Sequence, residues 1–217
     1  FKQKTAYEIR LSLVGSEMCI RDRYMQSTAY DETRAKVDPD NVLCWRRPIL
    51  RLEGEIIRDS ILAVSGTLDA TLFGAGSLDQ GHKRRSVYFT IKRSKLIPLM
   101  GLFDAPDTLQ SLARRSSTTI APQAMALMNN PHIRTAAQAF GKKLLPLAVS
   151  ATADAVRAGY RSALGREPDG EELEASVGFI KEQSDAYKAA GKQNGLELAL
   201  ANFCQALISL NEFVYVE

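Results

Sequence analysis

The sequence predicts a mainly α-helical, bundle-like domain with one small β element and an irregular, proline-rich corner. Apolar residues recur at helical spacing over most of the chain. Residues 86–93 instead alternate apolar and polar side chains, which is typical of a half-buried strand. Residues 84–131 contain four of the eight prolines and two Arg-Arg pairs, so the helices on either side must pack around an irregular stretch.

Composition places the chain among globular proteins: its 217 residues are 45% hydrophobic and 24% charged. The net charge of +3 arises from 28 basic and 25 acidic residues, which is far from the one-sided charge of a protein that coats nucleic acid. No apolar run approaches the roughly 20 residues that cross a bilayer, and the first residues lack the apolar block of a secretion signal. We therefore expect no nucleic-acid partner, no membrane insertion and no targeting signal in this sequence.

Cysteine and histidine are scarce. The three cysteines form no Cys-x-x-Cys motif, which removes the usual signatures of zinc ribbons, redox pairs and attached haem. With only two histidines, a metal site would depend on carboxylates, and these show no ligand spacing. The sequence therefore predicts neither a metal nor another cofactor. The residues concerned are Cys19, Cys44, Cys204, His82 and His132.

Residues 1–23 differ from the rest of the chain and resemble a translated sequencing adapter, a recurrent artefact at the ends of assembled metagenomic reads. The alternative is a short amphipathic strand or helix. A segment of artefactual origin carries no information about the native fold. We therefore predict that residues 1–23 are non-native and that residues 24–217 form a single α-dominated domain, a fragment of a longer protein.

A turn and an amphipathic helix open this domain. Residues 38–41 (DPDN) predict a turn, because proline fixes φ and the Asp and Asn side chains bond their own backbone. Apolar residues recur at helical spacing from Ile49 onward, and Gly66 supplies a stop. Arg51 and Glu55 have the i,i+4 spacing of an ion pair on the solvated face of this helix.

The segment around the helix adds one aromatic residue, a loop and the predicted strand. Trp45, which precedes two arginines, either packs against the start of the helix or stacks on a sugar or base. Residues 68–83 hold three glycines and predict a loop. The strand predicted at residues 86–93 then places its three apolar side chains on one face.

The corner carries the candidate functional residues. Pro98 begins a short helix, Ala105-Pro106 forces an extended exit, and residues 123–128 predict the next helix. Arginine and aspartate gather between them. Guanidinium groups bind carboxylate, sulfate or phosphate bidentately, whereas the same residues acting as caps and ion pairs would hold the corner together. Both interpretations stay open, and no residue is assigned a catalytic or metal-binding role. The candidates are Arg84, Arg85, Arg93, Asp104, Asp107, Arg114, Arg115, Thr118 and Gln123.

The C-terminal third of the sequence predicts four helices. The first spans residues 133–147, and the second is capped by Thr152 and ends at Gly165. The third begins with Asp169 and Glu172 at capping-box spacing. The last has a core stripe of apolar residues at spacings of three and four: Leu196, Leu200, Phe203, Leu207 and Leu210.

Eight sequence blocks carry a resemblance to a known family. They are AKVDPDNVLCWR (35–46), RLEGEIIRDSILAVSG (51–66), RRSVY (84–88), FDAPD (103–107), RRSSTT (114–119), QAMALMNNP (123–131), YRSALGREP (160–168) and CQALISLNEF (204–213). In this order they resemble the C-terminal domain of unknown function of large secreted planctomycete and verrucomicrobial proteins. In those proteins it commonly accompanies a second uncharacterised domain and a planctomycete-type cytochrome c domain.

The resemblance implies an exported module, in the periplasm, cell envelope or extracellular space, whose partners are the upstream domains of the same polypeptide. It implies no settled reaction, and no haem ligand is transferred because Cys-x-x-Cys-His does not occur here. We expect a docking or scaffold module of a cytochrome-c-linked assembly, without catalytic activity of its own. The alternative is a domain that binds or processes anionic polysaccharide, with the corner arginines holding sulfate or carboxylate and Asp104 or Asp107 acting as acid or base.

Overall fold

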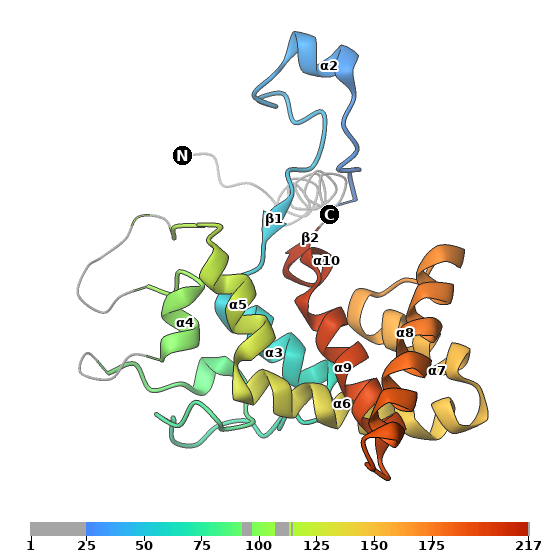
Figure 1. The fold of residues 1–217 in the computed structure, drawn as a ribbon. Coiled ribbons are helices and arrows are strands. Elements are labelled where there is room, and N and C mark those ends of the chain that lie inside the picture. The colour runs from blue at the N-terminus through green and yellow to red at the C-terminus, as the bar shows by residue number, and fades with distance from the viewer. Residues whose placement is uncertain (1–24, 93–96, 107–112, 114, 217) are drawn as a thin grey trace, which may run out of the picture. The chain divides into compact units, whose positions relative to one another are not determined.

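The computed structural model describes residues 25–92, 97–106, 113 and 115–216, and this part of the chain is mainly helical (Figure 1). It holds nine α-helices, one 3-10 helix (η1) and one two-stranded sheet. The predicted fold class, mainly α with a small β element, is confirmed. The elements are α2 (Glu32–Val37), β1 (Leu50–Arg51), α3 (Gly54–Val64), η1 (Ser86–Tyr88), α4 (Pro98–Leu102), α5 (Ala121–Asn129), α6 (Pro131–Ser150), α7 (Thr152–Leu164), α8 (Gly170–Ala189), α9 (Gly195–Ser209), α10 (Asn211–Val214) and β2 (Tyr215–Val216).

The chain forms two compact units: Arg51–Val214, and the residues up to Leu50 together with the C-terminal end from Tyr215. Every buried apolar side chain of the described chain belongs to the first, larger unit. The predicted single domain over residues 24–217 stays a prediction, as does the non-native origin of residues 1–23, which lie outside the described residues.

The smaller unit is organised by the predicted turn at residues 38–41. The Asp38 carboxylate accepts hydrogen bonds from the backbone N–H groups of Val42 (2.9 Å) and Leu43 (2.8 Å). Trp45 Nε1 donates to the Asp38 carbonyl at 2.9 Å, and the Arg46 guanidinium lies 5.2 Å from the centroid of the Trp45 ring. Trp45 therefore stabilises this turn, which favours the structural interpretation of the residue.

Four long helices build the core of the larger unit. Helix α9 packs against both α6 and α8, while α7 contacts α6 and α8 (Figure 1). A Cβ atom on Gly141 of α6 would lie 2.9 Å from the backbone nitrogen of Ala201 on α9, so glycine permits this close approach. The largest fully buried side chains are Ile57, Phe140, Leu144, Val156, Ile180, Leu200, Cys204 and Ile208.

The four predicted C-terminal helices are confirmed as α6 to α9. Asp169 and Glu172 form the expected capping box: the Glu172 N–H donates to the Asp169 carboxylate at 2.7 Å, and the Asp169 N–H donates to Glu172 at 2.9 Å. Gly165 ends α7 with a left-handed φ of 74°. The expected cap at Thr152 is wrong, because α7 already includes this residue and the N-cap position is Ala151.

The strand predicted at residues 86–93 is also wrong in its position. Ser86–Tyr88 forms η1, and Phe89 makes only an isolated bridge to Ser77, whereas the two-stranded sheet pairs β1 with β2. The alternating pattern misleads because its apolar face is not buried: Val87 is 70% and Ile91 73% exposed. Ser86 turns inward instead, because its N–H and hydroxyl both donate to the Asp59 carboxylate at 2.7 Å.

Helix α3 is shorter than predicted. It begins at Gly54 rather than at Ile49, so Arg51 lies in β1, before the helix. The expected pair between Arg51 and Glu55 is therefore replaced by pairs with residues far along the chain: Arg51 binds Asp104, and Glu55 binds Arg115.

Candidate functional site

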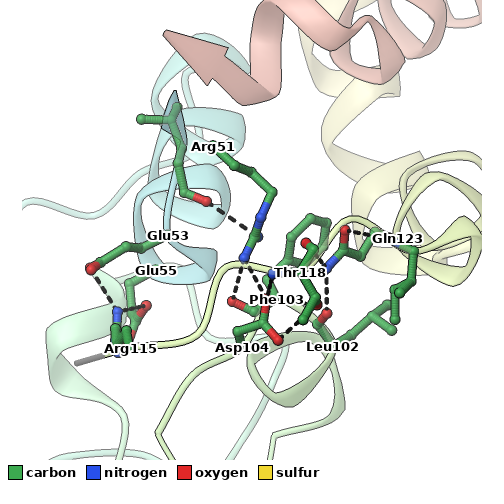
Figure 2. Close-up of polar contacts among 11 residues, drawn as sticks. Arg51, Glu53, Glu55, Leu102, Phe103, Asp104, Arg115, Thr118 and Gln123 are labelled. Atoms are coloured by element: carbon green, nitrogen blue, oxygen red, sulfur yellow. Dashed lines mark hydrogen bonds and ion pairs between the residues drawn. The ribbon is translucent and has the colours of Figure 1, made fainter. Parts of the chain in front are cut away.

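Asp104 connects three segments of the corner. It follows α4 in a left-handed conformation, with φ of 59°. Its carboxylate accepts hydrogen bonds from Arg51 Nη2 (2.6 Å), the Thr118 N–H (2.8 Å) and the Thr118 hydroxyl (2.9 Å) (Figure 2). Gln123 Nε2 donates to the carbonyls of Leu102 (2.9 Å) and Thr118 (3.2 Å). The structure thus brings Asp104, Thr118 and Gln123 into one network.

Arg51, which the sequence did not single out for this site, supplies the positive charge of the network. Its side chain is only 5% exposed and lies over the Phe103 ring, 5.5 Å from the centroid. A buried cation costs several kcal/mol unless it is paired. The Asp104 carboxylate, itself 16% exposed, provides that pairing. Asp104 is therefore committed to an internal partner.

Arg115 forms a second cluster, with two carboxylates at the start of α3. Its guanidinium lies 2.6 Å from Glu53 and 2.5 Å from Glu55 (Figure 2). Burial is the largest single effect and raises the pKa of Glu55, but the hydrogen bonds from Arg115, a backbone hydrogen bond and the charge of Arg115 together outweigh it and hold this pKa below its usual value. The hydrogen bond with Glu55 in turn raises the pKa of Arg115. Both groups stay ionised and are paired with each other.

Arg84 and Arg85 have separate roles. The Arg84 guanidinium lies 3.6 Å from the centroid of the Tyr88 ring, and it donates to backbone carbonyls of the preceding loop, among them that of Ala75 at 3.1 Å. Arg84 thus holds the loop. Arg85 Nε lies 3.7 Å from Asp59, and the Arg85 side chain is 58% exposed, which makes it the least engaged candidate described.

Three of the nine candidates, Arg93, Asp107 and Arg114, lie outside the described residues. The partners that sequence reasoning missed are Arg51, Glu53 and Asp59. No local signal could have found them, because each lies on or beside α3 at spacings typical of an ordinary solvated helix face. Their partners are contributed by segments that only the folded chain brings close.

A cavity of about 790 Å³ lies beside these clusters, between α3, residues 85–92 and α4. We call it the corner cavity. Its apolar lining includes Ile56, Val87, Ile91 and Met100, of which the first three are 45%, 70% and 73% exposed. Six charged residues line it: Lys92, and the members of the ion pairs above, Glu53, Glu55, Asp59, Arg85 and Arg115.

Several chemistries have no support among the described residues. No three His, Cys, Asp or Glu side chains there lie close enough to hold a metal ion. Cys204 is fully buried, and burial raises the pKa of its thiol, so it stays protonated and unreactive. Within the same ranges, no helix has the length and apolar character needed to cross a membrane.

The described part of the chain is a mainly helical module. The charged residues described at its corner are largely engaged in ion pairs and hydrogen bonds with each other. The chain belongs to the family described as PSD1, a protein of unknown function (DUF1553), whose model matches residues 14–180. Helices α9 and α10 lie beyond the matched range. No curated protein and no solved structure gave a significant match.

Proposed function

We propose that this chain is a docking module that binds an apolar segment of a partner in the corner cavity. The observation that carries the proposal is the exposure of Val87 and Ile91, 70% and 73%, in the lining of a cavity of about 790 Å³. Apolar side chains exposed in a concave, polar-rimmed surface are typical of protein-interaction sites. The charged rim would set the orientation of the bound segment.

The partner in this proposal is an upstream domain of the same polypeptide, within an exported, cytochrome-c-linked assembly of the cell envelope. The support is the resemblance carried by the eight sequence blocks and membership of the PSD1 family. A docking segment with leucine or phenylalanine anchors would match the apolar lining.

The anionic-polysaccharide alternative is less well supported. An arginine that recognises sulfate or carboxylate needs free N–H donors. Arg115 already binds two carboxylates, and Arg84 binds backbone carbonyls. Asp104 accepts hydrogen bonds from Arg51 and Thr118, so it is poorly placed to act as a general acid or base.

The test measures binding between this chain and the upstream part of its polypeptide by isothermal titration calorimetry. Ile91→Glu places a charge in the apolar lining, and we expect at least a tenfold loss of affinity. Val149→Glu is the matched control, because Val149 is 72% exposed and lies on α6, outside the cavity lining. Equal affinities for the two variants would contradict the proposal.

A second arm addresses the alternative. Thermal unfolding is followed with and without sulfated and uronic-acid oligosaccharides, in the parent chain and in Arg85→Ala. We expect no shift of the midpoint in either protein. A glycan that stabilises the parent chain but not Arg85→Ala would instead establish the polysaccharide function, because a ligand at 100 times its dissociation constant adds about 2.7 kcal/mol.

A further inference from the structure

The only two histidines of the chain line one small cavity. This histidine cavity, of about 200 Å³, lies between α3, residues 80–83, α4 and α6, apart from the corner cavity. Ile61, Leu99 and Ile133 contribute an apolar side to it, and His82 and His132 a polar one. Two residues 50 positions apart are thus brought to the same site by the packing of α6 on α3.

His82 is unusual because both of its ring nitrogens are buried without a hydrogen-bond partner. The ring packs edge-on against Phe89, with centroids 4.4 Å apart, which fixes its position. Burial, together with the nearby charge of Arg58, lowers the pKa of His82. Buried polar atoms nearly always have partners, so two such atoms on one ring beside a cavity indicate a ligand that supplies them.

The charge of the lining indicates the type of ligand. Among the described residues that line the histidine cavity, Arg58 and Lys83 are basic and none is acidic. Arg58 donates to the carbonyls of Arg84 (3.0 Å) and His82, so its charge is held in place beside the cavity. Other charges act on His82 from outside the lining: Arg84 disfavours its protonation, and Asp59 and Asp79 favour it.

We propose that the histidine cavity binds a small organic carboxylate, whose apolar body contacts Ile61, Leu99 and Ile133. Its carboxylate accepts hydrogen bonds from Lys83 and from His82, whose imidazole makes a half-turn in place to bring a nitrogen, closed to solvent in the free protein, towards the cavity. A volume of about 200 Å³ holds on the order of seven atoms of water size, which limits the ligand to a short fatty acid or a single aromatic ring. The bound anion would favour the protonated imidazole, so binding takes up a proton.

The test uses pentanoate and benzoate as probes, with pentanamide and benzamide as neutral isosteres. Calorimetry on the full chain should show carboxylate binding at least tenfold tighter than amide binding, and tighter at pH 6 than at pH 7.5. His82→Phe keeps an aromatic ring against Phe89 but removes both nitrogens, and it should lose at least tenfold in affinity. Lys83→Gln should weaken binding several-fold, whereas Lys181→Gln on α8 should leave it unchanged.

The free His82→Phe protein provides the folding control. Its thermal midpoint should equal or exceed that of the parent chain, because the substitution removes two buried polar atoms that lack partners. The proposal is overturned if the amides bind as tightly as the acids, if neither acid binds at 10 mM, or if a folded His82→Phe protein binds like the parent. In the parent chain, a His82 imidazole NMR titration that pentanoate does not shift to higher pH would overturn it as well.

Discussion

Asp104 shows how one residue stabilises the corner. It adopts a left-handed backbone conformation, which aspartate and asparagine tolerate better than most residues. Its carboxylate then binds Arg51 from β1 and Thr118 from the segment before α5. The identity of the side chain therefore contributes to both the turn and the charge balance.

Asp104→Asn keeps the shape and the turn preference but removes the charge. The Arg51 side chain, 5% exposed, would then be a buried cation without a counter-ion. We expect the free energy of unfolding to fall by about 2–4 kcal/mol, measured by urea denaturation. Asp154→Asn removes the partner of Arg157 in an exposed pair and should cost less than about 1 kcal/mol. Similar losses for both variants would show that the corner pair is not structurally important.

Glu172 makes the stability depend on pH. Hydrogen bonds from Arg166 lower the pKa of Glu172 to about 2, and Arg166 also binds Glu212 at 2.6 Å. A carboxyl group whose pKa is lower in the folded state than in the unfolded state stabilises the folded protein. This contribution is fully present at pH values above the unfolded-state pKa of about 4.3, and it is lost as the pH falls towards 2.

Arg166→Gln should therefore return the Glu172 pKa towards about 4.3, measured from carboxyl carbon shifts by NMR. The same variant should flatten the acid side of the stability curve, between about pH 4.3 and 2. A Glu172 titration that the substitution leaves unchanged would show that the ion pair does not form in solution.

At the scale of elements, the packing of α6 on α9 depends on one glycine. The Cβ atom of an alanine at position 141 would approach the Ala201 nitrogen to 2.9 Å and the Leu200 carbonyl carbon to 3.1 Å. The three nearest atoms are all backbone atoms, which cannot rotate away. The two helices would have to separate.

Gly141→Ala should therefore lower the free energy of unfolding by about 1–3 kcal/mol, despite the better helix propensity of alanine. Gly178→Ala is the matched control: Gly178 lies within α8, and its added Cβ meets no atom within 4 Å. The Gly178→Ala substitution should raise the free energy of unfolding by about 0.5–1 kcal/mol. Denaturant unfolding of both variants separates the steric effect from helix propensity, and two changes of the same sign would contradict the packing argument.

The helices were predictable from sequence because the signals that specify them are local. Apolar spacing, the capping box at Asp169 and the stop at Gly165 all act within a few residues. The strand was not predictable in position, because pairing needs a partner. Residues 86–92, the described part of that segment, alternate correctly but pair with no strand among the described residues, while the short β1 and β2 pair across more than 160 residues without a pattern of their own.

At the scale of the whole molecule, buried apolar side chains are concentrated in one unit. Those described run from Ile57 to Val214, whereas residues 25–50, the described part of the chain before Arg51, hold the partly polar turn around Asp38 and no buried apolar side chain. Apolar burial supplies most of the favourable free energy of folding. The larger unit should therefore account for nearly all of the stability.

Removing residues 1–49 should shift the thermal midpoint by no more than about 4 °C, which corresponds to roughly 1–2 kcal/mol for a chain of this size. Removing residues 195–217 deletes α9, which contacts α6, α7 and α8, and should abolish cooperative unfolding. Calorimetry on both truncated chains provides the measurement. A large loss of stability in the first would show that the N-terminal segment contributes to the core.

The sequence by itself determined the mainly helical class, the four C-terminal helices and the family resemblance, since these depend on local periodicity and on the order of short blocks. It also drew attention to Asp104, Arg115, Thr118 and Gln123. Only the tertiary structure decided what those residues contact. Arg51 meets Asp104 across 53 positions and Arg115 meets Glu55 across 60, and such pairings follow from the packing of whole elements rather than from spacing along the chain. The two cavities arise for the same reason.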